Sequence, residues 1–417
     1  MKKVLLGILL LLTVYSKASF ILIPMDETQS NHLKAYGIAY WILTKNAPID
    51  WLLNYRGGSF AFAYSKDFEK ECLIRNVKYE TIADAQMSKI LQDIANPEVN
   101  MDAVRLEKAP KIAVYSPKTK QPWDDAVTLV MTYAEIPYTV IYDEEILDEN
   151  LHLYDWLHLH HEDFTGQYGK FFAAYQNADW YQQQVADYEK RAKALGFTKV
   201  AEEKLAVAKK IRDFVMGGGY LFAMCSATDS YDIALASEGV DICPTPFDHD
   251  GMDPNAQQKI DFTKGFAFQN YQLSTNPYEY EFSTIDVPGV RPIAKEMDYF
   301  SLFDFSAKWD QIPSMLTQDH NRIIKGFMGQ TTAFKRPLIK PDVLILGENK
   351  SLNEAKYIHG IYGKGTWTFY GGHDPEDYQH RVGDPTTDLN LHPNSAGYRL
   401  ILNNILFPAA KKKPQKT

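Results

Sequence analysis

The stretch that most constrains this chain of 417 residues is Gly217–Ala227, which joins a triple glycine, a short apolar run and a cysteine. The glycines end a helical pattern, and Leu221–Met224 then has the composition of a buried strand. Cys225 follows where strand gives way to helix, with Ala223 and Ala227 two places to either side. Small residues at those places let the backbone turn sharply and present a nucleophile, as in a nucleophile elbow. The stretch therefore predicts an α/β fold with a cysteine at the edge of its sheet.

Strand and helix signals alternate over residues 111–225, a rhythm typical of a parallel sheet covered by helices on both faces. The expected strands are apolar runs at 112–115, 139–142, 156–160 and 221–224. The expected helices have apolar residues three and four apart and cover 124–134, 179–195 and 204–215. Later elements are a strand at 342–347, a hairpin of 357–360 and 365–370, and a closing helix at 395–407. We therefore expect an α/β domain whose sheet is mostly parallel.

A smaller α+β unit is expected before this domain, because strand signals there flank one helical pattern at 32–43 and end at the glycine turn of Arg56–Ser59. The expected organisation is a signal peptide at 1–18, a small α+β N-terminal domain at 19–108, the α/β domain at 109–408 and a basic tail at 409–417. Within the α/β domain we expect a helical insertion at 165–200 and an irregular insertion at 244–335. Irregular loops of this kind usually carry substrate selection.

The first eighteen residues have the three parts of a secretory signal: Lys2 and Lys3, an apolar run at Val4–Val14, and Ser16–Ala18 as a cleavage site. The apolar run is shorter than the roughly 20 residues that a membrane-spanning helix needs. A retained signal anchor is the alternative interpretation. We expect cleavage after Ala18, no membrane span in the mature chain, and a secreted or periplasmic location.

The charge of the chain argues against nucleic acid as a partner. Loss of residues 1–18 removes three lysines and no acid, so the formal net charge would move from −9 to −12. Affinity for nucleic acid comes largely from the neutralisation of phosphates by Lys and Arg. The 26 Tyr and 22 Phe fit a small-molecule or glycan substrate, and equally a thick aromatic core. The oligomeric state stays open.

A candidate base follows a late strand, within Tyr370–Glu376. There His373 would take the proton of the Cys225 thiol and return it to the leaving group. Asp374 or Glu376 would hold the imidazole in the correct tautomer, as in a catalytic triad. The sequence thus predicts a nucleophile, a base and an acid from two distant parts of the chain.

The oxyanion of such a reaction would be met by the backbone N–H of Ser226 and by an N–H from the loop near Gly166. Two structural alternatives compete with catalysis. Cys225 would be inert as a buried thiol, or it would form a bridge with Cys243 in an oxidising compartment. With Cys72 as the third cysteine, the chain is no disulfide scaffold.

Histidines and acids gather at 158–163, where His158 and His160 lie on one face of a strand and His161 on the other. The run, which continues into Glu162, ends a strand and should lie at the carboxyl edge, where ligands bind. Our first interpretation is contact with substrate or support of the cysteine, without a cofactor. The alternative is a zinc or similar ion. Its candidate ligands are His158, His160, His249 and His373.

With this order of elements established, the region from about 110 to 408 resembles the class I glutamine-amidotransferase-like superfamily and, more loosely, its trehalose-utilisation (ThuA-like) branch. The likeness rests on Gly217–Gly219, on Ala223–Ala227 and on Gly363–His373. It implies a flavodoxin-like, mostly parallel sheet with helices on both faces, a cysteine at the elbow, here Cys225, and a histidine after a late strand, here His373.

Two departures from that superfamily argue against glutamine as the substrate. Ala223 and Ala227 stand where glutamine-hydrolysing members have glycines, and Ser226–Asp229 contains no glutamine. Their histidine is followed directly by proline and glutamate, whereas Asp374 intervenes here. The resemblance therefore implies the chemistry of the superfamily without its usual substrate.

The whole chain is also similar to a secreted bacterial family often labelled asparagine synthetase B. Such a synthetase needs a cysteine directly after the initiator methionine, where this chain has Lys2, and a Ser-Gly-Gly-x-Asp-Ser loop that this chain lacks. Synthetase activity in the literal sense is therefore not expected.

From the elbow, the late histidine and the first resemblance together, we predict a hydrolase that cleaves an amide or related bond through Cys225 and His373. The alternatives are a non-catalytic glycan- or protein-binding protein on the same fold and a metal-dependent hydrolase built on 158–163.

Overall fold

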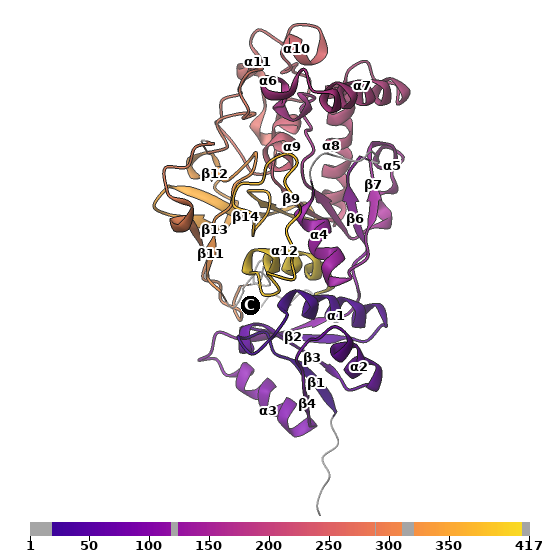
Figure 1. Ribbon diagram of the computed structural model, residues 1–417, viewed down its shortest axis with the longest axis vertical. Coiled ribbons are helices and arrows are strands. Elements are labelled where there is room, and N and C mark those ends of the chain that lie inside the picture. The colour runs from indigo at the N-terminus through magenta and orange to yellow at the C-terminus, as the bar shows by residue number, and fades with distance from the viewer. Residues whose placement is uncertain (1–18, 118–123, 288, 311–320, 411–417) are drawn as a thin grey trace, which may run out of the picture.

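The computed structural model describes residues 19–117, 124–287, 289–310 and 321–410. The predicted signal peptide and most of the predicted basic tail lie outside these residues. In the described part, strands form a five-stranded sheet near the N-terminus and a ten-stranded sheet in the rest of the chain. Figure 1 shows an elongated molecule with the small sheet toward one end and the large sheet near the middle, and the helices labelled α1, α4 and α12 lie between the two sheets.

The five-stranded sheet is antiparallel and has the order β4-β1-β3-β2-β5. Its strands are β1 (Phe20–Ile23), β2 (Ile49–Leu53), β3 (Ser59–Ala63), β4 (Glu80–Ile82) and β5 (Asp102–Leu106). Its helices are α1 (His32–Thr44), α2 (Lys66–Ile74) and α3 (Asp84–Ala95). Successive residues of β1 point to opposite faces, so Ile21 and Ile23 join the core that α1 covers, while Leu22 packs with residues of α3.

The ten-stranded sheet has the order β11-β10-β13-β14-β15-β9-β8-β6-β7, with β12 beside β14. The parallel strands are β6 (Ile112–Tyr115), β7 (Thr139–Ile141), β8 (Trp156–Leu159), β9 (Tyr220–Met224) and β15 (Gly365–Tyr370). The antiparallel strands are β10 (Tyr299–Leu302), β11 (Ile323–Lys325), β12 (Phe334–Lys335), β13 (Leu344–Asn349) and β14 (Glu354–Tyr362).

The prediction of a flavodoxin-like, mostly parallel sheet is therefore wrong. Antiparallel pairs outnumber parallel pairs in this mixed sheet, because β10 to β14 all run against their neighbours. The physical reason lies in the connections: a tight turn joins only antiparallel strands, whereas a parallel pair needs a crossover of a dozen residues or more. The short turn at Tyr362–Gly365 fixes β14 antiparallel to β15, and β13 follows the same rule one strand further out.

Helices cover both faces of the large sheet. The helices that bury the most residues against it are α4 (Ala126–Ala134), α8 (Val200–Gly217), α9 (Ala227–Ala236) and α12 (Ala396–Leu406). Alternation along β6 sends Val114 into the core shared with α4 and α12, and Ala113 into the core shared with α8 and α9. The shorter or outer helices are α5 (Asp143–Leu147), α6 (Phe172–Tyr175), α7 (Asp179–Ala194), α10 (Thr245–Asp248) and α11 (Ala256–Lys259).

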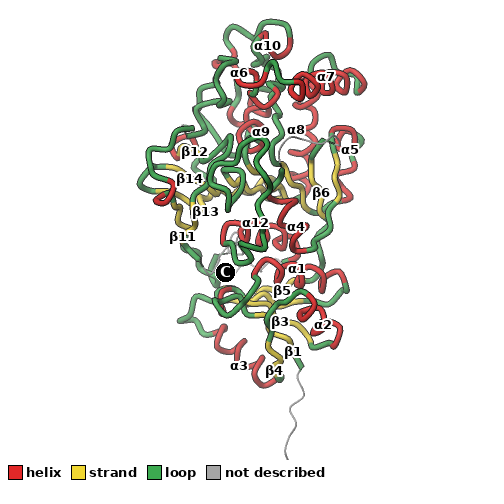
Figure 2. Tube along the Cα trace, in the orientation of Figure 1, coloured by secondary structure: helices red, strands yellow, loops and turns green. Residues whose placement is uncertain are grey.

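Helix α1 connects the two halves of the molecule, since it packs against α4 and α12 as well as against its own sheet. Between α9 and β12 the chain runs mainly as loops, which Figure 2 shows beside the large sheet. Among the described residues, no helix is both long enough and apolar enough to cross a bilayer.

Candidate active site

Cys225 follows the last residue of β9 and has φ of 52°, in the left-handed region that residues with a side chain seldom adopt. Helix α9 starts two residues later, at Ala227. Ala223 and Ala227 are fully buried on either side, so there is no room for larger side chains at this bend. The sharp turn between strand and helix that the sequence predicts is therefore present, and the cysteine is the residue that carries the strain.

The segment Met328–Thr332 crosses in front of this bend, although it is about 100 residues away in the sequence. Its backbone N–H groups at Gln330 and Thr331 lie near the Cys225 sulfur, as does the N–H of Ser226, and all three lower the pKa of the thiol. A second contact fixes the segment, because the N–H of His373 donates to the carbonyl of Met328 at 2.9 Å. The segment thus links the cysteine to the predicted base.

Gly329 permits this close approach. A Cβ atom at Gly329 would lie 2.7 Å from the backbone nitrogen of His373, which is closer than real Cβ contacts. The chain can therefore pass over His373 only because this position has no side chain.

Cys225 and His373 line one cavity of about 400 Å³. The other lining residues come mainly from the long loops and include the aromatic rings of Phe171, Tyr175 and Tyr280 and the charged groups of Glu281, Asp286 and Arg381. Cys225 is 3% exposed and His373 is 7% exposed, so both reach solvent only through this cavity. The two residues predicted as nucleophile and base thus line the same cavity, and their roles stay predictions.

The protonation states at the site follow from burial. Burial raises the pKa of the Cys225 thiol to about 11, and the three N–H groups on the sulfur oppose that rise. Burial also holds the pKa of His373 well below its ordinary value, and the neighbouring His160 and His380 rings act in the same direction. The resting pair is therefore a neutral thiol and a neutral imidazole, rather than a thiolate and an imidazolium.

The two predicted orienting acids contact other groups. Glu376 lies 3.1 Å from Nδ1 of His392, and Asp374 accepts the N–H of Glu376 at 2.8 Å. Neither ring nitrogen of His373 has a hydrogen-bond partner among the described residues. The His373 ring instead packs among imidazoles, with centroids 4.8 Å from both His160 and His161 and 4.5 Å from His380.

The histidines of the predicted run have two different surroundings: His158 and His160 contact Asp125, whereas His161 lines the cavity. His158 is fully buried, and its Nε2 lies 3.0 Å from Oδ2 of Asp125, the residue that caps helix α4. The other oxygen of Asp125 lies 3.1 Å from Nδ1 of His160. Burial disfavours the charge of Asp125, but His158 and His160 keep its pKa well below the usual range. His161 lines the cavity directly, and its Nε2 lies 2.6 Å from the carbonyl of Asp124.

Other predicted site residues lie elsewhere or play different parts. Gly166 packs against Ala201 of α8, where a Cβ would meet it at 2.8 Å, so the N–H groups near Cys225 come from Gln330 and Thr331 instead. Glu162 accepts a hydrogen bond from the Tyr142 hydroxyl at 3.2 Å, and burial raises its pKa to about 7.

Two further residues also differ from the sequence expectation. His249 is exposed and lies 3.3 Å from Glu189, away from the other histidines. Cys243 is free like Cys72 and Cys225, and its thiol donates to the Thr165 carbonyl at 3.0 Å. The structure thus contains no bridge between Cys225 and Cys243.

Sequence reasoning missed Asp125, His380 and the two loop N–H groups. Asp125 has a local signal, since an acid just before an apolar helical pattern is a typical N-cap. His380 lies between Asp124 and Asp377, with 2.9 Å to each. No local signal marks Gln330 and Thr331, because their place depends on the packing of an irregular loop.

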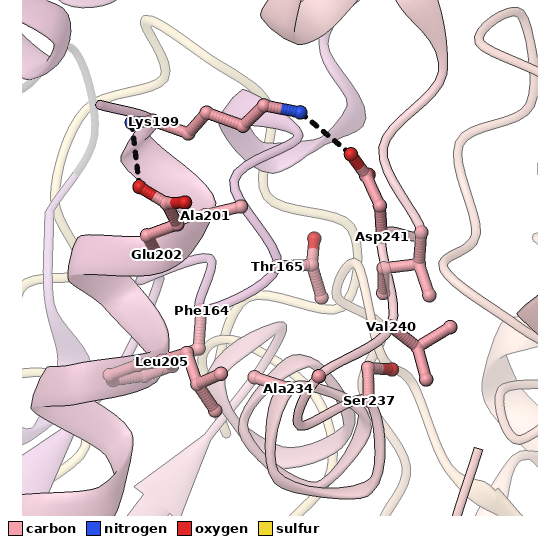
Figure 3. Close-up of a pocket in the computed structure, with 12 residues that line it drawn as sticks. Phe164, Thr165, Lys199, Ala201, Glu202, Leu205, Ala234, Ser237, Val240 and Asp241 are labelled. Atoms are coloured by element: carbon pink, nitrogen blue, oxygen red, sulfur yellow. Dashed lines mark hydrogen bonds and ion pairs between the residues drawn. The ribbon is translucent and has the colours of Figure 1, made fainter. Parts of the chain in front are cut away.

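A second cavity of about 240 Å³ lies between α8 and the loop after α9 (Figure 3). At its mouth the Lys199 amine lies 2.7 Å from Asp241 and 2.9 Å from Asp248. The amine thus forms ion pairs with both carboxylates, and no residue of the predicted site lines this cavity.

Comparison with known proteins leaves the family open. No family model matches the chain, and no curated protein matches it. Among solved structures, a cytoplasmic protein of Salmonella typhimurium LT2 has a TM-score of 0.38 and 11% identity, covering 72% of this chain and 100% of that one. A second cytoplasmic protein of S. typhimurium has a TM-score of 0.30 and 9% identity, covering 64% and 89%. A β-galactosidase from Bacillus circulans sp. alkalophilus has a TM-score of 0.24 and 11% identity, covering 73% and 32%.

These likenesses are too distant to carry an argument about activity. The two S. typhimurium proteins are nevertheless described as cytoplasmic, which disagrees with the secreted or periplasmic location that we predicted. We therefore withdraw that location and put none in its place.

Proposed function

We propose that this protein is a hydrolase that cleaves an amide or related bond, with Cys225 as nucleophile and His373 as base. The observation that carries the proposal is the left-handed backbone of Cys225, at the end of a parallel strand and in a cavity shared with His373. Strained residues of this kind cluster at functional sites, because a packed surrounding must hold them in place. The resemblance to the class I glutamine-amidotransferase-like superfamily supports the same chemistry.

In the proposed reaction, a ring nitrogen of neutral His373 takes the proton of the Cys225 thiol as the sulfur attacks the carbonyl carbon of the substrate. The developing oxyanion is met by the N–H groups of Gln330 and Thr331 once the sulfur bonds to carbon. The C–N bond breaks, and the amine leaves with the proton from His373. Water then hydrolyses the thioester, and His373 receives and returns a proton again.

The aromatic rings in the cavity favour a small-molecule or glycan substrate. Phe171, Tyr175 and Tyr280 offer apolar faces, and the Phe171 and Tyr280 rings lie 6.0 Å apart by centroid. The same rings would also serve a non-catalytic glycan-binding protein, which is our second candidate. Formation of an acyl-enzyme separates the two, because a binding protein has no reason to acylate Cys225.

The test is acylation by a p-nitrophenyl ester, with mass spectrometry to locate the acyl group. We expect acylation at Cys225 in the wild-type protein, its loss in Cys225→Ala and a rate at least tenfold lower in His373→Gln. Cys243→Ala is the matched control, because Cys243 is equally buried but has no place in the cavity. Acylation at residues other than Cys225, or an acylation rate in His373→Gln equal to that of wild type, would refute the mechanism.

A further inference from the structure

Three imidazoles lie close together beside the cavity, and two of them, His161 and His373, line it. His160 and His161 follow strand β8, and His373 follows β15, so all three come from the carboxyl edge of the parallel strands. The rings of His160 and His161 lie 3.8 Å apart by centroid, and His373 lies 4.8 Å from each. One ring nitrogen from each of the three lies within 4.8 Å of the others.

The acceptors around the cluster favour particular tautomers. Nδ1 of His160 lies 3.1 Å from an oxygen of Asp125, and because a carboxylate only accepts, this contact favours the proton on Nδ1 and the lone pair on Nε2. A carbonyl also only accepts, so Nε2 of His161, 2.6 Å from the Asp124 oxygen, carries the proton and Nδ1 keeps the lone pair. The protein thus prepares two imidazoles as electron-pair donors.

Two of these side chains are buried with nitrogens that nothing in the described residues satisfies. His160 is 2% exposed, and neither of its ring nitrogens has a hydrogen-bond partner there, although Nδ1 lies 3.1 Å from an oxygen of Asp125. His373 is 7% exposed, and both of its ring nitrogens also lack a hydrogen-bond partner among the described residues. Buried polar groups without partners cost free energy, and each calls for an explanation such as an ion.

We propose that His160, His161 and His373 bind one divalent transition-metal ion of the zinc class, with the remaining coordination position open to the cavity. Imidazole nitrogens select zinc, copper or nickel over magnesium and calcium, which prefer oxygen. Three protein ligands and an open position form the usual arrangement of a catalytic rather than a structural zinc site. Ligands at 2.0–2.1 Å from a tetrahedral ion lie roughly 3.4 Å apart, so side-chain shifts of about 1 Å close the cluster.

The surroundings of the cluster match those of known metal sites. Ligating histidines commonly donate their other N–H to a carboxylate or carbonyl, which orients the ring. Here the Asp125 carboxylate lies 3.1 Å from Nδ1 of His160, and the Asp124 carbonyl accepts the N–H of His161. Asp125 is itself fixed, because its Oδ1 accepts the N–H groups of Val127 and Thr128 at the start of α4.

This inference goes beyond the proposed hydrolysis and does not depend on it. An ion on His373 would occupy the lone pair that takes the thiol proton. The metal-bound form and the thiol-reactive form are therefore alternative states of one site, and zinc should inhibit acylation of Cys225.

The test uses the chelator-treated full chain, titrated with Zn²⁺ by calorimetry and with Co²⁺ by visible absorption. We expect one ion per chain, a Co²⁺ spectrum of tetrahedral intensity, and at least 100-fold weaker binding in His160→Gln and in His161→Gln. Asp125→Asn should weaken binding 10- to 100-fold. His249→Gln is the matched control, because that exposed histidine lies outside the cluster and should leave affinity unchanged.

Circular dichroism shows whether each variant folds. Two independent histidine variants are used, so that the test still stands if one of them does not fold. Absence of stoichiometric binding by the folded wild-type protein would overturn the metal site, as would an affinity equal to that of wild type in both histidine variants. Acylation of Cys225 in the metal-free protein is measured separately. If the metal-free protein is not acylated although it binds the metal as expected, the proposed function alone is refuted. If the metal-free protein is acylated at Cys225 but binds no metal, the metal site alone is refuted.

Discussion

The hydroxyl of Thr331 donates a hydrogen bond of 2.8 Å to the carboxylate of Asp229, which joins the loop in front of Cys225 to the helix that follows it. Both residues are buried, with no more than 1% of either exposed. Burial raises the pKa of Asp229 to about 7, although the Thr331 hydroxyl opposes the rise. The loop that supplies N–H groups to the sulfur is thus held by a group that titrates near neutrality.

Asp229→Asn should change how stability depends on pH. In the wild-type protein the native state keeps a proton on Asp229 between about pH 4 and pH 7, whereas the unfolded chain loses it, so this residue makes the free energy of unfolding fall as pH rises. The variant lacks this contribution. Between pH 4.5 and 7 its free energy of unfolding should rise relative to wild type by about 2–4 kcal/mol. Denaturant titrations at both pH values measure this, and parallel curves would contradict it.

The backbone strain at Cys225 gives a second prediction. Ala at φ of 52° keeps the strain, whereas Gly has no such penalty, so Cys225→Gly should be more stable than Cys225→Ala by about 1 kcal/mol. At an ordinary strand or helix position the order is the reverse. Urea unfolding of both variants decides the matter, with Ala223→Gly as control, because that position lies within β9 and should lose stability.

The sequence predicted individual elements well, because their signals are local. The closing helix expected at 395–407 is α12 at Ala396–Leu406, and the strand that delivers Cys225 is β9 at Tyr220–Met224. Pairing direction is not local. Strands β10 and β11 lie in the stretch that we expected to be irregular, since they are short and gain their partners only from β13 and from each other.

The same division holds for the site. Cys225 has a signal in its neighbours, because the elbow needs small residues nearby. Asp374 and Glu376 were assigned from their closeness to His373 in sequence, but after the turn at Gly372, where φ is 93°, their carboxylates contact other groups. The catalytic roles of all four residues stay predictions.

Lys356 gives a third prediction. Its amine donates to the carbonyls of Phe327 and, at 2.7 Å, of Thr332, so it holds both ends of the loop in front of Cys225. Burial lowers the pKa of Lys356 to about 7. Above pH 7 the unfolded chain binds a proton that the native state lacks, so this residue makes stability rise with pH toward 10.5.

Lys356→Met should abolish that rise. Relative to wild type, the free energy of unfolding of the variant should fall by about 2 kcal/mol between pH 7 and pH 9. Lys335→Met, which removes a lysine from the neighbouring β12, is the control. An equal slope in Lys356→Met and wild type would show that this amine is charged in the native state.

Arg399 connects the two halves of the molecule and gives the last prediction. It is fully buried on α12, and its guanidinium donates to the hydroxyl of Tyr36 at 3.0 Å, to the carbonyl of Met25 at 3.3 Å and to the carbonyl of Gly57. The glycine turn expected at Arg56–Ser59 is thus the place where the N-terminal sheet meets the C-terminal helix.

Arg399→Met should lower the free energy of unfolding by about 3 kcal/mol, because it leaves buried carbonyls without donors. Arg399→Lys should cost less, about 1–2 kcal/mol, since an ammonium cannot reproduce the planar fork. Arg105→Met is the control: its ion pair with Asp50 is half-exposed, and such pairs contribute at most about 1 kcal/mol. Urea unfolding ranks the three variants. If Arg399→Met were no less stable than Arg105→Met, the two halves would be held together by apolar packing of α1 rather than by this guanidinium.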